Sequence, residues 1–222
     1  MKICAFSDMH GQYDFKVEPC DIVLICGDIV PLKIQKYTDD TEVWIKTFFI
    51  PWCNNLPCEK VVFIAGNHDF YFERHPDRVK RLLEGQDKIV YLDCESYEYK
   101  GKIIYGTPWC KPFYNWAFME ETSKSDERYK DVQHIDILMS HDASYGVSDV
   151  LLQNCWWADG THIGNLALRT LLDRTNPSLY VFGHLHSCQH ERRLHNDTSV
   201  FCVSLLDENY EMVYEPLYFN LE

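Results

Sequence analysis

Several features that would assign a protein to a particular class are missing from this chain of 222 residues. No stretch approaches the roughly 18 consecutive apolar residues of a membrane-spanning helix. We find no internal repeat, no linker rich in Gly, Ser or Pro, and no low-complexity tract. The first residues, Met1 to Asp8, lack the apolar centre and cleavage site of a signal peptide. We therefore expect a single domain over residues 1–222, located in the cytoplasm without a membrane partner.

Basic residues are also scarce in this chain. The 21 Lys and Arg residues are outnumbered by 34 Asp and Glu residues, which gives a formal net charge of −13. A protein that binds a nucleic-acid backbone usually clusters its Lys and Arg residues, and no expected element carries such a stripe. Long DNA or RNA is therefore not an expected partner. Oligomeric state is not indicated by any pattern in the sequence.

Cysteine, by contrast, is frequent, with ten residues. Such a number would suggest disulfides in a short secreted chain. Several of these cysteines, such as Cys4, Cys26 and Cys202, instead lie in strand-like runs, where a free thiol behaves as a small hydrophobic group. The pair Cys53 and Cys58 is too isolated in the sequence to predict a zinc site.

Polar residues of types that can bind metal ions follow apolar runs at five places along the chain. Each of these runs predicts a buried strand, so the side chains after them are expected to converge at the strand ends. The runs are Lys2–Ser7, Asp21–Gly27, Lys60–Gly66, Ile135–Ser140 and Leu179–Gly183. The candidate segments are Asp8-Met9-His10, Gly27-Asp28, Gly66-Asn67-His68-Asp69, Ser140-His141 and Gly183-His184-Leu185-His186.

The spacing within these segments is typical of a centre for two metal ions. Asp8 and His10 are two residues apart and point to one side of an extended chain, so both can reach one cation. Asp28 has two oxygens and can bridge two cations roughly 3.5–4 Å apart. With the amide of Asn67 and the imidazoles, the oxygen and nitrogen donors suit Mn²⁺, Fe, Zn²⁺ or Ni²⁺. Each segment alone could be an ordinary turn, but five in series favour a two-metal hydrolase.

In these motifs the chain resembles the calcineurin-like metallophosphoesterase superfamily, whose signature is D-x-H, G-D, G-N-H-[D/E], a lone His and G-H-x-H in this order. The similarity extends toward a small branch of cyclic-nucleotide phosphodiesterase-like, metallophosphoesterase-domain-containing proteins. The segments that carry it are 20–24, 55–57, 100–109, 115–118 and 136–141. After His141 that branch tends to have two prolines, whereas this chain has Asp142-Ala143-Ser144, which puts the substrate rather than the metal site in question.

The resemblance implies a role for each motif residue. One metal ion would be bound by Asp8, His10, Asp28 and His186, and the other by Asp28, Asn67, His141 and His184. The expected pair is Mn²⁺, with Fe, Zn²⁺, Ni²⁺ and Mg²⁺ as alternatives. A bridging hydroxide would attack phosphorus, and His68 is the expected catalytic acid. Asp69 is a second catalytic candidate, which either caps the next helix or supports a neighbouring histidine.

Substrate contacts are expected from Asn67, His68 and Trp109. The indole of Trp109 could stack on a base or an aromatic leaving group, or it could be a packing residue. The remaining histidines have no ligand spacing and are left out of the site, although His162 lies in a long loop and could line it. The histidines left out of the site are His75, His134, His162, His190 and His195.

The expected function is hydrolysis of a small phosphodiester, for which a cyclic nucleotide is one candidate. Hydrolysis of a phosphomonoester, as by a nucleotide or protein phosphatase, uses the same chemistry and stays open as the alternative. A non-catalytic scaffold on the same fold is a third hypothesis. Proteins of this fold that act as scaffolds have usually lost metal-ligand residues, whereas every ligand position is intact here.

Periodicity and turn residues predict an α/β (α+β) fold in which strands alternate with helices. Strands are expected over 2–7, 21–27, 60–66, 89–92, 96–99, 102–106, 135–140, 179–183, 199–204 and 210–215. Helices are expected over 40–50, 75–84, 123–130 and 164–173, the first ended or kinked by Pro51. Two mixed sheets flanked by helices follow from this order. The resemblance likewise implies a four-layer αββα sandwich.

Overall fold

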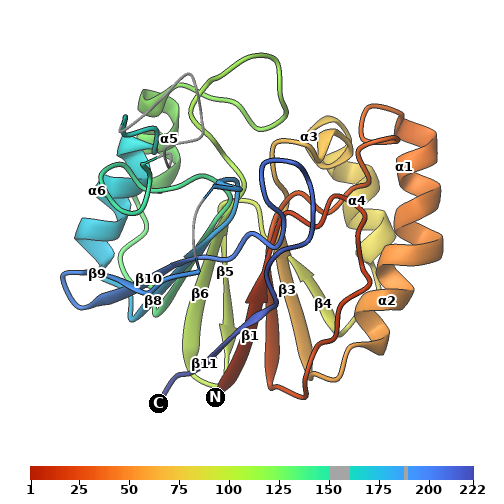
Figure 1. Ribbon diagram of the computed structural model, residues 1–222, viewed down its shortest axis with the longest axis horizontal. Helices are drawn as coiled ribbons and strands as arrows, with labels where there is room; N and C mark the ends of the chain where they lie inside the picture. The colour runs from red at the N-terminus through yellow and green to blue at the C-terminus, as the bar shows by residue number, and fades with distance from the viewer. Residues whose placement is uncertain (151–160, 188–189) are drawn as a thin grey trace.

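Two β-sheets pack face to face, and helices cover the outer face of each sheet (Figure 1). This computed structural model describes residues 1–150, 161–187 and 190–222. The arrangement is the αββα sandwich expected from the sequence, and both sheets are mixed. No helix within the described ranges is both long enough and apolar enough to cross a membrane.

The first sheet contains the strands that precede the first three motifs. Its order is β11-β1-β2-β3-β4, formed by β1 (Lys2–Phe6), β2 (Ile22–Cys26), β3 (Lys60–Ile64), β4 (Ile89–Tyr91) and β11 (Leu217–Asn220). Strands β1 to β4 are parallel, whereas β11 runs antiparallel to β1. The carboxyl ends of the parallel strands therefore lie at one edge, which is the upper edge in Figure 1.

The second sheet contains the strands that precede the last two motifs. Its order is β5-β6-β7-β8-β10-β9, formed by β5 (Glu95–Tyr99), β6 (Lys102–Thr107), β7 (Ile137–Ser140), β8 (Leu179–Phe182), β9 (Arg193–His195) and β10 (Thr198–Cys202). Strands β6, β7, β8 and β10 are parallel, and β5 and β9 are antiparallel edges. As expected from their alternation, β5 and β6 form a hairpin.

The helices divide between the two outer faces, as Figure 1 shows. The first sheet is covered by α1 (Thr38–Trp44), the π-helical turn η1 (Ile45–Phe49), α2 (Ile50–Asn55), α3 (Phe70–Arg74) and α4 (Pro76–Leu83). The second sheet is covered by α5 (Thr122–Tyr129) and α6 (Leu166–Thr175). The side chain of Asn165 caps α6 by accepting from the backbone N–H of Ala167 and Leu168.

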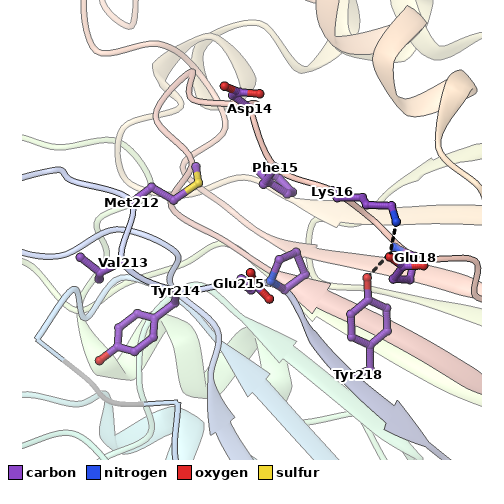
Figure 2. A pocket seen from close by; sticks show the side chains of 10 residues that line it. Asp14, Phe15, Lys16, Glu18, Met212, Val213, Tyr214, Glu215 and Tyr218 are labelled. Atoms are coloured by element: carbon purple, nitrogen blue, oxygen red, sulfur yellow. Dashed lines mark hydrogen bonds and ion pairs between the residues drawn. The ribbon is translucent and has the colours of Figure 1, made fainter.

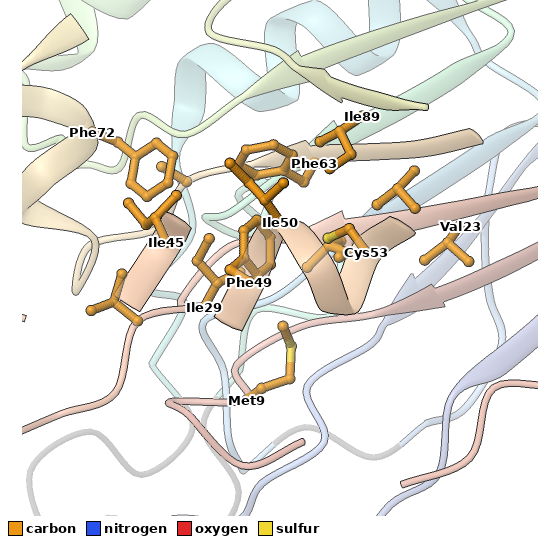
Figure 3. Packing of buried hydrophobic residues seen from close by; sticks show 14 of the residues in the cluster. Met9, Val23, Ile29, Ile45, Phe49, Ile50, Cys53, Phe63, Phe72 and Ile89 are labelled. Atoms are coloured by element: carbon orange, nitrogen blue, oxygen red, sulfur yellow. The ribbon is translucent and has the colours of Figure 1, made fainter. Parts of the chain in front are cut away.

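Three buried apolar clusters occupy the three spaces between the layers. Val23 belongs to the cluster beneath α1 and α2, where Phe49 and Phe63 meet edge to face (Figure 3). Its neighbour Ile22 points the other way and packs with Ile104 between the two sheets. A further cluster lies between the second sheet and α5 and α6. Because central strands are buried on both faces, they read as continuous apolar runs in the sequence.

The helix expected over 40–50 is longer than predicted. It begins at Thr38, widens into the π-helical turn η1 and continues as α2 to Asn55. Pro51, expected to end or kink it, lies in the first turn of α2. A π-helical turn replaces the hydrogen bonds between residues four apart, one of which Pro51 cannot donate. The local widening thus lets the helix continue past this residue.

The prediction of a strand over 210–215 is wrong. The Asp207 side chain accepts from the backbone N–H of Asn209 and Glu211, and Tyr210 has φ of +60°, so this segment forms a turn. The last strand is β11, which pairs with β1 instead. The short elements α3 and β9 were not expected, because five and three residues show no clear period.

Truncation of Phe63 tests the cluster beneath the helices. Its ring is fully buried and contacts the rings of Phe49, Phe72 and Tyr91. We expect Phe63→Ala to lower the free energy of unfolding by about 3–5 kcal/mol, measured by urea denaturation. The matched control is Val43→Ala, whose side chain is exposed and whose loss should change stability by less than about 0.5 kcal/mol. Equal effects of the two substitutions would contradict this packing.

Candidate metal centre

The five motifs meet at the carboxyl edge of the two sheets, directly after β1, β2, β3, β7 and β8. Chain segments that are far apart in sequence are adjacent there because parallel strands of both sheets end at this edge. Residues Asp8, His10, Asp28, Asn67 and His141 are buried at this edge. The structure also brings His184 and His186 to the same place, so all seven predicted ligands converge.

Asp28 is the centre of this cluster. Its Oδ2 atom lies 3.5 Å from Nε2 of His10, 3.4 Å from Nε2 of His141 and 4.0 Å from Nε2 of His68. One carboxylate oxygen thus faces imidazoles from three different strand ends. The possible ligand atoms in each of three overlapping groups lie within 4.8 Å of one another: Asp8, His10, His186; His10, Asp28, His68; and Asp8, Asp28, His141.

The remaining predicted ligands contact this centre. Oδ1 of Asn67 is 2.8 Å from Nε2 of His141. The ring of His184 lies beside that of His141, with 5.1 Å between their centroids. Nε2 of His186 is 3.4 Å from Oδ1 of Asp8. The geometry therefore has two halves that share Asp28.

Hydrogen bonds on the far side of the rings fix their orientation. Nδ1 of His141 donates to the carbonyl oxygen of Cys26 at 2.8 Å, and Nδ1 of His186 donates to that of Asp207 at 2.9 Å. Both rings therefore present Nε2 to the cluster, in the tautomer that a metal ligand needs. The Asp8 carboxylate accepts from the hydroxyl groups of Ser7 and Ser204 and from the backbone N–H of His184.

The backbone is strained where the ligands are presented. Asp8, His10, Asp28 and His184 have φ between +45° and +70°, a region that costs energy for residues other than glycine. Such conformations persist only where the surrounding structure enforces them, and they concentrate at functional sites. Sequence patterns do not report this feature, since Asp and His are ordinary residues at a strand end.

Small residues next to the ligands make room for them. A Cβ atom on Gly27 would lie closer than 3 Å to the His141 ring, and one on Gly66 would approach both Asp28 and His141 as closely. A Cβ atom on Gly183 would meet the Asp8 carboxylate in the same way. Each of these three glycines is therefore needed because the side chain of a candidate ligand occupies the space where its own side chain would be.

Burial and neighbouring charges set the protonation of the cluster. Burial alone would raise the pKa of Asp8 and Asp28, but nearby histidines outweigh it and hold both well below their usual range. Burial lowers the pKa of His10 to about 4 and that of His184 to about 3. Burial also disfavours a charged His141, yet Asp28 raises its pKa to about 10. Ionised carboxylates and the neutral rings of His10 and His184 are the forms that bind metal ions.

His10 provides a direct test of whether the cluster fits a cation. Both of its ring nitrogens are buried, and neither has a hydrogen-bond partner within the described part of the chain. A buried polar atom without a partner is costly, and a metal ion would accept the lone pair of one of these nitrogens. The donor set of carboxylates, imidazoles and one amide therefore fits a divalent transition-metal ion.

His68 borders the cluster and is held from two sides. Its backbone N–H donates to Oδ1 of Asp28 at 2.7 Å, and its Nδ1 donates to Oε1 of Gln35 at 2.6 Å. The ring also stacks on the indole of Trp116, with centroids 4.3 Å apart. Burial lowers the pKa of His68, and Nε2 is left to face the cluster.

Asp69 supports the loop after β2 instead of capping a helix. Its carboxylate accepts from the backbone N–H of Ile29, Val30 and Gly66, at 3.1, 3.0 and 2.8 Å. It precedes α3, but its side chain makes no capping hydrogen bond there. Burial, followed by the charge of Asp28, raises the pKa of Asp69 to about 7. The residue therefore links the segments that carry Asp28 and Asn67.

Trp109 does not lie at the cavity. Its Nε1 donates to Asp93 at 3.0 Å, and the guanidinium of Arg128 covers its ring at 4.0 Å. Trp116 takes the position that we expected for Trp109. It was present in one of the segments that carry the family resemblance, but no pattern distinguished it from neighbouring aromatic residues.

A cavity of about 280 Å³ opens onto the cluster. Its floor contains ligands from both halves, and its walls are mainly aromatic. The rings of Tyr210 and His10 are 5.0 Å apart, so Tyr210 borders the cluster beside His10. The lining residues are Asp28, Asn67, His68, Phe113, Tyr114, Trp116, Ile163, His184, Leu185, His186, Glu208 and Tyr210.

The other histidines lie outside the cluster. His162 contacts Asp149 at 2.6 Å, His195 contacts Asp173, His190 donates to the carbonyl of Ser204, and His75 contacts Thr38. A second cavity of about 500 Å³ lies between residues 14–18 and 212–218 (Figure 2). No histidine lines it among the described residues, so it offers no comparable donor set.

Comparison with protein families gives a match to calcineurin-like phosphoesterases over residues 1–188. A UPF0046 protein of Caenorhabditis elegans is 30% identical over 183 residues, which cover 75% of this chain and 63% of that protein. Metallophosphoesterase domain-containing protein 1 of Homo sapiens is 23% identical over 242 residues, which cover 97% of this chain and 69% of that protein. The chain thus spans just under two thirds of the nematode relative.

Solved structures share the fold. The protein TT1561 of Thermus thermophilus superposes with a TM-score of 0.61 at 12% identity, covering 93% of this chain and 89% of that one. Phosphopantetheinyl hydrolase of Mycobacterium tuberculosis gives a TM-score of 0.58 at 13% identity, covering 94% and 90%. At these identities the likeness establishes the αββα architecture alone.

The close packing of Gly66 yields a test of metal binding. An added methyl group would displace Asp28 and His141, so we expect Gly66→Ala to weaken Mn²⁺ binding on the order of 10-fold or more, measured by calorimetry. The control is Gly85→Ala, because Gly85 has positive φ but no atom within 4 Å of the added group. Unchanged affinity in a folded Gly66→Ala protein would contradict this arrangement.

Proposed function

Because this chain belongs to the calcineurin-like phosphoesterase family, we propose that it is a metal-dependent hydrolase of small phosphodiesters. The observation that supports this most directly is the position of Asp28, whose carboxylate faces imidazoles of both halves of the cluster. A shared carboxylate of this kind is what a pair of adjacent divalent ions requires.

We assign the seven candidate ligands to two sets, as the family resemblance implies. Asp8, His10, Asp28 and His186 would hold one ion, and Asp28, Asn67, His141 and His184 would hold the other. Mn²⁺ is the proposed metal, with Fe, Zn²⁺, Ni²⁺ and Mg²⁺ as alternatives. When bound, such ions supply Lewis-acid chemistry that activates water as a nucleophile and neutralises charge on phosphoryl oxygens.

His68 is the proposed proton donor to the departing alcohol. Its Nδ1 donates to Gln35, so proton transfer requires the doubly protonated ring, whose second proton lies on Nε2 and faces the cluster. Trp116 stacks on the ring and restricts its rotation. Proton donation by a positioned histidine contributes most when the leaving alcohol is a poor leaving group, because its developing charge is then greatest.

The cavity wall favours a diester over a monoester. A phosphomonoester near neutral pH carries close to two negative charges, and proteins usually balance them with Lys or Arg in addition to metals. The lining contains no Lys or Arg among the described residues, and Glu208 adds negative charge. A diester carries a single negative charge and two organic groups. The aromatic side chains of Phe113, Tyr114, Trp116 and Tyr210 offer apolar surface for such groups.

Substrate preference can be measured with two nitrophenyl esters. In the presence of Mn²⁺, we expect kcat/KM for bis-p-nitrophenyl phosphate to exceed that for p-nitrophenyl phosphate. Asp28→Asn should reduce diester hydrolysis on the order of 100-fold, because both ligand sets lose a negative charge. Equal or faster hydrolysis of the monoester would make the protein a phosphatase, and hydrolysis of neither would refute the proposed function.

The role of His68 can be separated from general damage to the site by varying the leaving group. We expect His68→Ala to lower kcat for an alkyl leaving group by about 100-fold or more, and for p-nitrophenolate by much less. His134→Ala serves as the control, because this exposed side chain lies outside the cluster. A loss independent of the leaving group would assign His68 to binding.

A further inference from the structure

A second cluster of reactive side chains lies at the opposite edge of the first sheet, where its parallel strands begin. Cys4 lies in β1, Cys20 precedes β2 and Cys58 precedes β3. The side chain of Cys20 lies near those of both Cys4 and Cys58, so the three thiols form a short series with Cys20 in the middle. The phosphoesterase site at the other edge uses none of them.

Backbone contacts independently bring Cys20 next to Cys58. Strands β2 and β3 pair in parallel with Ile22 opposite Lys60. The pairing extends beyond the strands, because Glu59 N–H donates to Asp21 at 3.0 Å and Cys20 N–H donates to Pro57 at 3.1 Å. Counting back from Ile22 and Lys60 places Cys20 and Cys58 at corresponding positions on neighbouring segments. Cysteines on adjacent extended segments have a separation that a disulfide can span.

The surroundings of Cys20 favour a reactive thiolate. Nζ of Lys2 donates to the carbonyl of Pro19 at 2.7 Å, which holds its positive charge next to Cys20. Interactions with the neighbouring thiols of Cys4 and Cys58 lower the pKa of Cys20 below its usual value. Thiols near Lys residues and near other thiols are the ones that peroxides oxidise.

Access differs among the three thiols. Cys20 and Cys58 are partly exposed, whereas Cys4 is fully buried against the helices. Tyr218 lies directly opposite Cys4 in the β1–β11 pairing, and its hydroxyl accepts from the backbone N–H of Glu18 (Figure 2). The side chain of Cys4 is thus enclosed on this flank. The thiol pair that a small oxidant reaches is Cys20 and Cys58.

We propose that Cys20 and Cys58 form a reversible disulfide when the protein is exposed to hydrogen peroxide. The Cys20 thiolate attacks one oxygen of the peroxide, the O–O bond breaks, and with one proton the products are a sulfenic acid and water. The Cys58 thiol then attacks the Cys20 sulfur, an S–S bond forms, and the hydroxyl group leaves as a second water. Two sulfur atoms are oxidised by two electrons in total, and a dithiol reductant reverses the change.

A metal site built from these three thiols fits the geometry less well than a disulfide does. Sulfur ligands of one metal ion must all be close to one another, roughly 4 Å apart for bonds of about 2.3 Å. Within the described part of the chain, no cysteine belongs to a group of three or more possible metal ligands whose ligand atoms lie within 4.8 Å of one another. A series with Cys20 in the middle instead suits bond formation between pairs.

The test is oxidation of the purified full chain by hydrogen peroxide, followed by digestion without reductant and mass spectrometry. We expect a cross-linked peptide pair containing Cys20 and Cys58, which dithiothreitol separates. Cys20→Ser and Cys58→Ser should each lose this cross-link, whereas Cys4→Ser should retain it. Cys53→Ser is the matched control, because Cys53 is buried in α2 close to Cys58 and should not be required.

A cross-link between Cys20 and Cys4, a thiol-bound metal ion that blocks oxidation, or no disulfide in the native protein would each overturn the proposal. Thermal unfolding of every variant shows whether it is folded, and the corresponding Ala variants replace any Ser variant that is not. Labelling with dimedone gives a second measurement. In the doubly substituted protein with Cys4→Ser and Cys58→Ser, Cys20 sulfenic acid should accumulate and react. None of these measurements depends on phosphoesterase activity.

Discussion

The structure depends on one buried carboxylate, that of Asp28, being held among imidazoles at the point where strands of two sheets end. Burying an ionised group costs several kcal/mol unless charges and hydrogen bonds compensate for it. Here His10 and His141 provide positive or polar partners at 3.5 and 3.4 Å, and the backbone N–H of His68 donates to the other oxygen at 2.7 Å. The sandwich fold makes this compensation possible because it brings both sheets to a common edge.

The cost of the cluster is distributed over the surrounding structure. Backbone strain at Asp8, His10, Asp28 and His184 costs about 1–3 kcal/mol for each residue, and the packed layers must hold these conformations in place. The apolar clusters on both faces of each central strand supply that stability, since the strands cannot shift without exposing them. Asp69 adds a local link by accepting three backbone N–H groups from the segments on either side.

The sequence was sufficient for the layers and for the convergence of the motif residues, because both leave strong local patterns. Apolar runs predicted nine of the strands that are observed, and the motif residues directly after five of them predicted the convergence at the strand ends. It was not sufficient for features that arise only from tertiary contacts. The thiols of Cys4, Cys20 and Cys58 are separated by 16 and 38 residues in the sequence, so nothing local indicates that they meet. Likewise, the spacing of apolar residues in the first helix does not predict the π-helical turn before Pro51.

The residues around the cavity illustrate this difference most clearly. The rings of Tyr210, His10, His68 and Trp116 follow one another at centroid distances of 5.0, 4.8 and 4.3 Å. The two histidines come from motifs, but Tyr210 and Trp116 come from irregular loops in which many aromatic residues are equivalent by pattern. Rigid strand ends therefore position the candidate metal ligands, whereas loops supply the aromatic side chains beside them. With His68 as the proton donor, the leaving alcohol would lie toward Trp116, and Tyr210 would contact the group that stays on phosphorus. The two ends of a diester would thus be selected by different loops, and a change in one loop would alter specificity for one end without disturbing the metal ligands.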